Sequence, residues 1–144
     1  MLAYFQKKKD IGHLKGVKFG NDNEEKALIQ FTEVEDYQLL RVGLVVPDKF
    51  WFLGVSPDGL IWNDSRPGFG IVEVKCLECP ETDGKIVNRA ELDENEQLKD
   101  TVGWYTQIQL TGWATKAEYA ILFLYSGKPE NCKVIEVELK NDWA

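Results

Sequence analysis

Two short stretches, Ser56-Pro57-Asp58-Gly59-Leu60 and Gly70-Ile71-Val72-Glu73-Val74-Lys75-Cys76, decide what fold and chemistry to expect of this chain. In the first stretch, Pro57 presets the backbone φ of a tight turn, and Gly59 accepts dihedral angles that other residues avoid. Bulky apolar residues precede this turn, as in a buried strand. The pattern therefore predicts that Asp58 is fixed by the turn at the mouth of a strand.

The second stretch is typical of a strand, in which successive side chains point to opposite faces of a sheet. Val72, Val74 and Cys76 are expected to point toward the core. Glu73 and Lys75 then share the other face, about 6.6 Å apart along the strand. The sequence thus predicts a carboxylate and an ammonium side by side on a strand.

This combination suits metal-dependent hydrolysis of a phosphodiester. Asp58 and Glu73 offer hard oxygen ligands for Mg²⁺, and the carbonyl of Val74 is a candidate third ligand. Mg²⁺ would acidify water and neutralise charge on the phosphate, while Lys75 would orient the attacking water. The alternative is a surface turn together with an exposed strand face that carries an ion pair.

The same residues resemble the PD-(D/E)XK nuclease superfamily, with Pro57-Asp58 and Glu73-Val74-Lys75 as its two signature segments. The longer strings are similar to the YqaJ or phage lambda exonuclease-like branch. Two further segments match helix motifs of that branch: a Gly followed by Glu24 and Ala27 at +4 and +7, and the aromatic-x-x-Gln-x-Gln motif of residues 104–109.

The resemblance implies an α/β fold with a restriction-endonuclease-like αβββαβ core, in which helices flank a central mixed sheet. It also implies Mg²⁺-dependent cleavage of DNA, with Mn²⁺ able to substitute, in most members by digestion from a duplex end in recombination or repair. The match assigns Glu24 to the metal site. It assigns Gln107 to contact with an acid, with water or with the scissile phosphate. Family members can form trimers, so a homo-oligomer is an open expectation.

Three other functions remain open at this point. The same site could cut DNA internally, or it could act on RNA, and closed circular DNA as substrate would separate these cases from an exonuclease. A degenerate nuclease fold could instead serve as a non-catalytic nucleic-acid or protein adaptor, which would show no metal binding that depends on Asp58.

Composition and charge set broader limits. A chain of 144 residues is expected to form a single domain over residues 1–144, and it contains no apolar run long enough for a membrane span. An intracellular protein of the cytoplasm or nucleus is expected. The net charge of −7 disfavours wrapping of a duplex with many phosphate contacts. Within the N-terminal arm of residues 1–18, Lys7, Lys8 and Lys9 are candidate DNA contacts, as is Lys99 further on.

Cysteine and histidine counts exclude other chemistry. Three cysteines do not make a disulfide framework, and the CxxC of Cys76 and Cys79 has only Cys132 and His13 as further zinc ligands. We therefore expect Cys76 to fill core space. A single His in a Gly- and Lys-rich segment disfavours Ser-His-Asp or Cys-His catalysis.

Periodicity and turn signals place the remaining elements. Helices are expected at residues 21–35, capped by Asn21 or Asn23, and 101–116, capped by Asp100 or Thr101. Strands are expected at 37–46 and 49–55 as a hairpin, and at 60–62, 69–76, 118–125 and 132–139. The segment 77–100 is expected to be irregular, with weak helical character at 88–99. Trp51, Phe52 and Trp62 are assigned to the core. Gln107 is predicted to face inward, with Gln109 on the opposite side of its helix.

Overall fold

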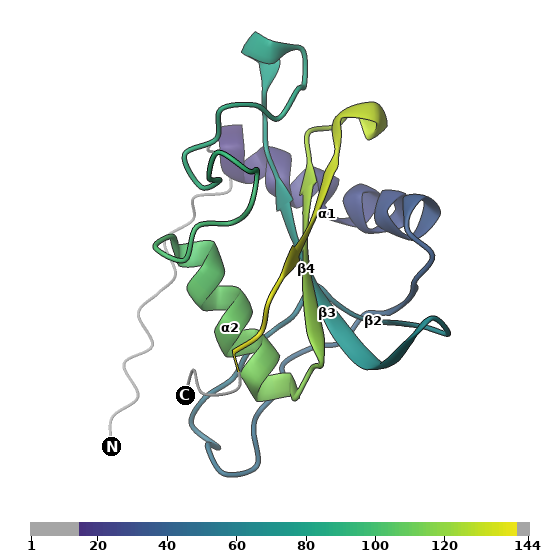
Figure 1. Ribbon diagram of the computed structural model, residues 1–144, viewed down its shortest axis with the longest axis vertical. Coiled ribbons are helices and arrows are strands. Elements are labelled where there is room, and N and C mark those ends of the chain that lie inside the picture. Colours follow the sequence, from purple (N-terminus) through teal and green to yellow (C-terminus); the bar gives the residue numbers. More distant parts are fainter. Residues whose placement is uncertain (1–14, 141–144) are drawn as a thin grey trace.

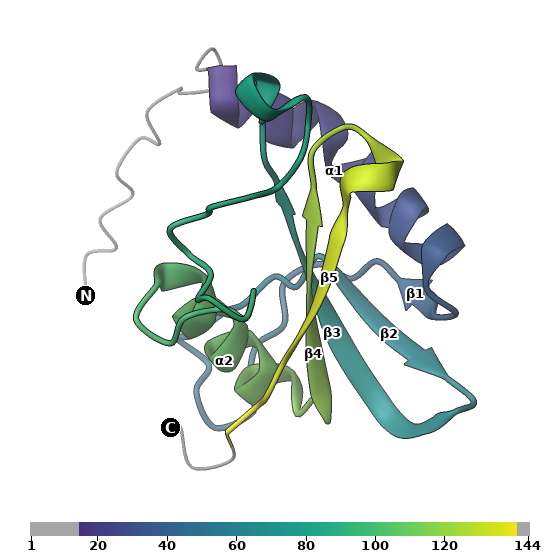
Figure 2. The same cartoon turned by 45° about the horizontal axis from the view of Figure 1, so that its top comes forward.

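The computed structural model describes residues 15–140, which form a mixed five-stranded sheet between two helices (Figures 1 and 2). The strands lie in the sheet in the order of the sequence, β3 and β4 are parallel, and all other neighbours are antiparallel. This confirms the αβββαβ arrangement, with one further strand at the edge. The elements are α1 (Lys15–Val34), β1 (Gln38–Leu40), β2 (Gly59–Asn63), β3 (Arg66–Cys76), α2 (Gly103–Thr115), β4 (Tyr119–Tyr125) and β5 (Lys133–Val137).

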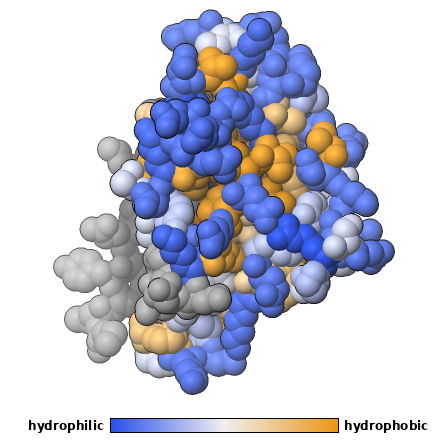
Figure 3. All heavy atoms as spheres, viewed as in Figure 1, coloured by the Kyte–Doolittle hydropathy of each residue, from blue (hydrophilic) through white to orange (hydrophobic). Residues whose placement is uncertain are grey.

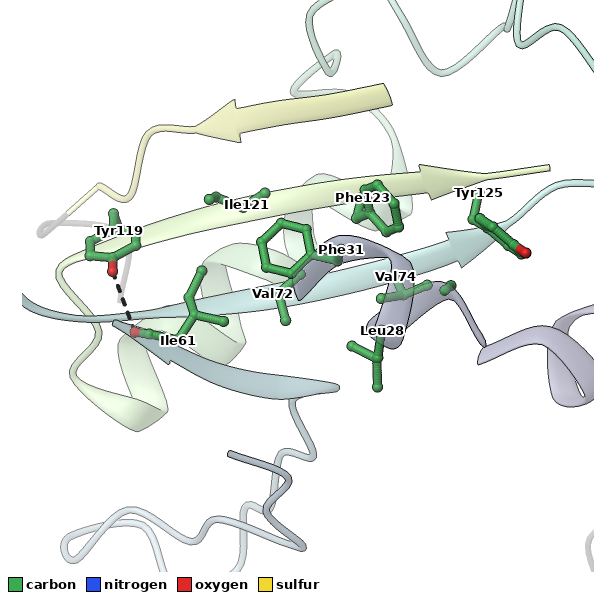
Figure 4. Packing of buried hydrophobic residues seen from close by; sticks show 10 residues of the cluster. Leu28, Phe31, Ile61, Val72, Val74, Tyr119, Ile121, Phe123 and Tyr125 are labelled. Carbon is green, nitrogen blue, oxygen red and sulfur yellow. Dashed lines mark hydrogen bonds between the residues drawn. The ribbon is translucent and has the colours of Figure 1, made fainter. Parts of the chain in front are cut away.

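Helix α1 covers one face of the sheet. Its residues Ala27, Leu28 and Phe31 are buried against the sheet side chains of this face. Phe31 lies 5.4 Å, ring centre to ring centre, from Phe123 at the middle of this cluster (Figure 4). The hydroxyl of Tyr119 donates a 3.3 Å hydrogen bond to a β2 carbonyl, so its polar end is satisfied inside the core.

Helix α2 and the long segment before it cover the opposite face. Ile108 of α2 packs with Ile71 of β3 and with Leu122 and Leu124 of β4. All seven residues of β4 are buried, so this strand lies at the centre of the sheet with both faces covered. In β5 exposed and buried residues alternate, which is typical of an edge strand with one face toward solvent.

The segment between β3 and α2 is irregular, as predicted, apart from one 3-10 turn at Pro80–Thr82. The weak helical character expected near its end is not found. Instead, Leu92 and Leu98 form an isolated bridge, and Leu92 and Ile86 are buried in the core. The segment therefore acts as part of the cover over the α2 face of the sheet.

Both helix starts differ from the prediction. Within the described residues α1 is already helical at Lys15, before the predicted start at Asn21. It contains no proline, and each glycine inside a helix costs only about 1 kcal/mol. Helix α2 has Val102 as its N-cap, without a side-chain hydrogen bond, rather than Asp100 or Thr101. Gln109 is 1% exposed; its amide donates to the carbonyl of Glu138 and accepts from a backbone N–H, which ties the chain after β5 to α2.

The predicted hairpin over residues 37–46 and 49–55 is wrong. Only Gln38–Leu40 forms a strand, and the remainder is a loop closed by a single bridge between Val45 and Val55. Two successive backbone turns, Pro47 to Phe50 and Phe50 to Leu53, occupy the place of the second strand. The turn that Pro47 predicts therefore continues to Leu53, and the apolar residues within it do not pair with another strand.

The aromatic side chains of this loop are exposed, which corrects their assignment to the core. Trp51 is 78% exposed and Phe52 is 72% exposed, and Trp62 of β2 is also largely accessible at 39%. Phe50 packs against Trp113 of α2, with ring centres 5.1 Å apart, and so attaches the loop to that helix. Apolar patches among polar residues are visible on the face of the molecule shown in Figure 3. Within residues 15–140 no helix combines the length and apolarity that a membrane crossing requires.

Replacing Phe31 with Ala tests the α1 side of the core. The ring is fully buried, so we expect a loss of about 3–5 kcal/mol in the free energy of unfolding. Chemical denaturation followed by tryptophan fluorescence measures it. The matched control is Ile29→Ala, because Ile29 lies on the same helix but is 53% exposed, and we expect a change within about 0.5 kcal/mol. Equal losses in the two variants would contradict the packing described for α1.

Candidate active site

Asp58 lies immediately before β2, at the point where the pairing between β2 and β3 ends. The last residue of β2 to pair with β3 on this side is Gly59, which lies opposite Val72. Beyond that point the backbone N–H of Val74 would lack a partner strand, and the Asp58 Oδ2 atom accepts it at 2.7 Å. A carboxylate that accepts a backbone N–H is held in a defined position. The turn thus fixes Asp58 as predicted, against β3 beside Glu73.

Glu73 and Lys75 leave β3 on the side of α2, where Gln107 meets them. The Gln107 amide donates to Glu73 Oε1 at 2.9 Å, and its carbonyl oxygen accepts from the Lys75 ammonium at 2.9 Å. The ammonium also lies 3.3 Å from Glu73 Oε1. One amide therefore orients both the acid and the amine. Gln107 itself is largely exposed rather than inward-facing, so the prediction of a buried amide is wrong although its contacts are those of the site.

The two carboxyl groups of this cluster, Asp58 and Glu73, both have a raised pKa. Burial is the main reason that the pKa of Glu73 rises to about 7, and the negative charge of Asp58 adds to the rise while Lys75 opposes it. Burial likewise raises the pKa of Asp58, with the Val74 N–H acting against it and the charge of Glu24 adding to it. Mutual repulsion of this kind is relieved when a cation binds between the acids.

The donor set fits a divalent cation. Among the described residues, one oxygen of each acid makes the hydrogen bonds given above, while Asp58 Oδ1 and Glu73 Oε2 accept none. Hard carboxylate oxygens are the ligands that Mg²⁺ and Mn²⁺ prefer. Between residues 15 and 140, however, no three His, Cys, Asp or Glu side chains are arranged to hold one metal ion. Within the described residues the centre is therefore a pair of acids, not a closed cage, and no group of three such side chains forms at the cysteines.

Glu24 lies at the rim of this centre and not inside it. Its charge acts on both Asp58 and Glu73, yet its Oε1 atom accepts a 3.3 Å hydrogen bond from Arg41. The side chain is 40% exposed. Glu24 as a metal ligand, directly or through water, stays a prediction, as does the carbonyl of Val74, whose N–H is the group seen to act in the site.

The predicted DNA-contact lysines divide into two groups. Lys7, Lys8 and Lys9 lie outside the described residues. Lys99 donates from its ammonium to the Ala90 carbonyl at 2.9 Å, so in this structure it braces its own loop. Its assignment to DNA stays a prediction. Cys76 is half-buried beside the core, and burial together with Glu24 and Asp58 raises the pKa of its thiol to about 11.

Two residues of the centre were missed by the sequence reasoning. Arg41 follows β1 and reaches Glu24, seventeen positions earlier in the chain. Trp104 lies one turn before Gln107 on α2, and the Lys75 ammonium lies 5.7 Å from the centre of its ring. The aromatic position of the helix motif gave a signal for Trp104. Arg41 gave none, because the segment around it was taken for a strand.

The family model described as YqaJ-like viral recombinase domain matches residues 2–118, most of the chain. No curated protein sequence matches closely enough to be counted as a relative.

Two solved structures share the fold. One is the alkaline exonuclease LHK-Exo from Laribacter hongkongensis, with a TM-score of 0.59 and 20% sequence identity over 86% of this chain. The other is LHK-Exo in complex with dAMP, with a TM-score of 0.58 and 20% identity over 85% of this chain. The match covers 59% and 58% of the LHK-Exo chain, so this chain spans less than two thirds of that protein.

Neutralising Asp58 should lower the pKa of Glu73. After burial, the charge of Asp58 is the largest influence that raises it, so in Asp58→Asn the titration midpoint of Glu73 moves below about 7. Carboxyl ¹³C NMR without divalent cations measures the shift. Asp64→Asn, an exposed acid on the turn between β2 and β3, serves as control and should leave the midpoint where it is. An unchanged midpoint in Asp58→Asn would show that the two acids do not interact.

Proposed function

Because the chain belongs to the family of YqaJ-like viral recombinase domains, we propose that it is a Mg²⁺-dependent deoxyribonuclease that digests linear duplex DNA from its ends. One observation carries the proposal. Two carboxylates of raised pKa, each with an uncommitted oxygen, lie beside an amine that a single glutamine holds in place. The solved exonuclease structures share the fold of this chain, which agrees with the proposal.

The metal would be held by the free oxygens of Asp58 and Glu73, with the Val74 carbonyl and Glu24 as further candidates. Mn²⁺ should replace Mg²⁺, since both take oxygen ligands. The chemistry that the ion supplies when bound is greater acidity of water and neutralisation of charge on the phosphate. Glu73 has to lose its proton first, so metal binding should strengthen as the pH rises through about 7.

Lys75 contributes the positive charge at the centre of the site. The Lys75 side chain is 21% exposed, and its ammonium is held between Glu73 Oε1 and Gln107 Oε1. An ammonium has three donors, so the third can orient a water molecule or contact the phosphate while the other two keep their partners. This third N–H of Lys75 would then stabilise the negative charge that builds on the phosphate in the transition state, because it is already in position.

Gln107 acts as a positioning residue. It donates to the acid and accepts from the amine, which holds the ion pair of Glu73 and Lys75 in one geometry. The ring centre of Trp104 lies 5.7 Å from the Lys75 ammonium. Without the amide, the Lys75 ammonium would lose the hydrogen bond that fixes its position beside Glu73.

The direct test is digestion of linear duplex DNA with Mg²⁺ and with EDTA. We expect Mg²⁺-dependent release of nucleotides, and a rate about 10²–10³-fold lower in Lys75→Met, since a donor aimed at the developing charge is lost. The matched control is Lys133→Met. Lys133 is also ion-paired and is 23% exposed against 21% for Lys75, but its partner is Glu96 in the loop before α2. The control should keep its activity.

The outcome also decides between the alternatives. Cleavage of closed circular DNA would show that the protein is an endonuclease with the same site rather than an exonuclease. Faster cleavage of RNA than of DNA would show that RNA is the substrate. Equal rates for wild type and Lys75→Met would remove Lys75 from the mechanism. Absence of activity in the wild type, together with absence of Mn²⁺ binding, would leave a non-catalytic adaptor.

A further inference from the structure

Arg41 is a cation of the acidic centre that the proposed mechanism does not use. It follows β1, and its Nη2 atom donates to Glu24 Oε1 over 3.3 Å. Its charge also lowers the pKa of Asp58, as the charge of Lys75 does. Arg41 therefore stands close enough to the centre to act on Asp58, on the side where α1 contributes Glu24.

The two cations that act on Asp58 differ in how firmly they are held. Lys75 is mostly buried and is engaged by Glu73 and Gln107. Arg41 is 56% exposed, and within the described residues its guanidinium makes one hydrogen bond, whereas it carries five N–H donors. An ion pair this exposed contributes little to stability. Glu24 can therefore give up Arg41 at little cost.

A guanidinium that makes a single hydrogen bond within the described residues has further donors with which to bind a phosphate. Its planar fork matches two phosphate oxygens, and such bidentate contacts are short and strong. The centre needs a contact of this kind, because Glu24, Asp58 and Glu73 would otherwise repel an approaching DNA backbone.

We propose that Arg41 binds a phosphate of the DNA backbone next to the centre, and that it leaves Glu24 when DNA arrives. The inference rests on the proposed function, since it takes DNA as the substrate. The exchange has a second consequence: the Glu24 carboxylate loses its partner as the substrate binds, and becomes free to face the centre. Arg41 is thus a substrate-binding residue whose partner in the free protein is an acid of the same site.

DNA affinity measured without catalysis tests the proposal. The full chain in EDTA is titrated with a fluorescently labelled linear duplex, and anisotropy gives Kd at several salt concentrations. In Arg41→Ala we expect Kd to rise about tenfold, and the slope of log Kd against log salt to fall by about one, because one phosphate contact is lost. Arg41→Lys should recover part of the affinity, since it keeps the charge but not the fork. Circular dichroism checks that both variants remain folded.

Two controls separate a phosphate contact from other roles. Lys128→Ala removes a cation from another exposed ion pair, that with Asp83, and should leave both Kd and the salt slope unchanged. Glu24→Gln removes the partner of Arg41 and keeps the guanidinium, so DNA affinity in EDTA should stay the same or increase. With Mg²⁺ present, Arg41→Ala should raise KM about tenfold and change kcat by less than about threefold.

The possible results do not overlap. Unchanged Kd and salt slope in Arg41→Ala would overturn the proposal, and so would weakening of equal size in Glu24→Gln, because Arg41 would then act only through the ion pair. A loss of kcat with unchanged KM would overturn it as well. If Arg41→Ala weakens DNA binding while the wild type shows no nuclease activity, the phosphate contact stands and the proposed catalytic function fails.

Discussion

The hydrogen bond from the Val74 N–H to Asp58 Oδ2 is the contact on which the candidate site depends. Antiparallel pairing of β2 with β3 ends at Gly59, opposite Val72, which leaves the next part of the β3 edge uncovered. A buried backbone N–H without a partner is costly, so the edge needs an acceptor. The side chain of Asp58 supplies it, and in doing so the acid is placed beside Glu73. The Oδ2 atom of Asp58 thus completes the hydrogen bonding of the sheet edge and at the same time positions the carboxylate in the candidate site.

The rest of the fold keeps this edge in place. Parallel pairing of β3 with β4 fixes β3 from its other side, residue by residue from Gly70 to Cys76. Helix α1 packs on the face that carries Val72 and Val74, and α2 packs on the face that carries Glu73 and Lys75 (Figures 1 and 2). Successive side chains of β3 point to opposite faces of the sheet, so Glu73 and Lys75 face α2 and lie within reach of Gln107 on that helix. The fold thus brings together Glu73 and Lys75 from β3, Gln107 from α2 and Asp58 from the turn before β2.

The parts of the site that the sequence could predict are those with a local physical signal. The turn of Ser56 to Gly59 fixed the place of Asp58, and strand alternation put Glu73 and Lys75 on one face. Gln107 was found through its helix motif, although its exposure was misjudged. By contrast, Arg41 and the exposed Trp51 and Phe52 lie in a loop whose apolar residues imitate a strand. Which apolar run finds a partner strand is decided by tertiary pairing, and no local pattern contains that information.

Gln109 is a second case in which a tertiary contact could not be predicted from a local sequence pattern. Helical spacing correctly placed it away from Gln107. Its burial could not be foreseen, because it depends on the chain after β5 returning to α2, about thirty residues later. Contacts that close such long loops are the ones that single-sequence reasoning loses, whereas the fold class and the acid pair follow from short stretches.

Diffraction from crystals of the full chain soaked in Mn²⁺ would test whether the two acids hold a metal, because the anomalous signal of manganese locates the ion independently of activity. We expect one strong anomalous peak in contact with the carboxylates of Asp58 and Glu73, lost in crystals of Asp58→Asn. No peak at this pair of acids at millimolar Mn²⁺, or a peak that persists in Asp58→Asn, would contradict the proposed metal site.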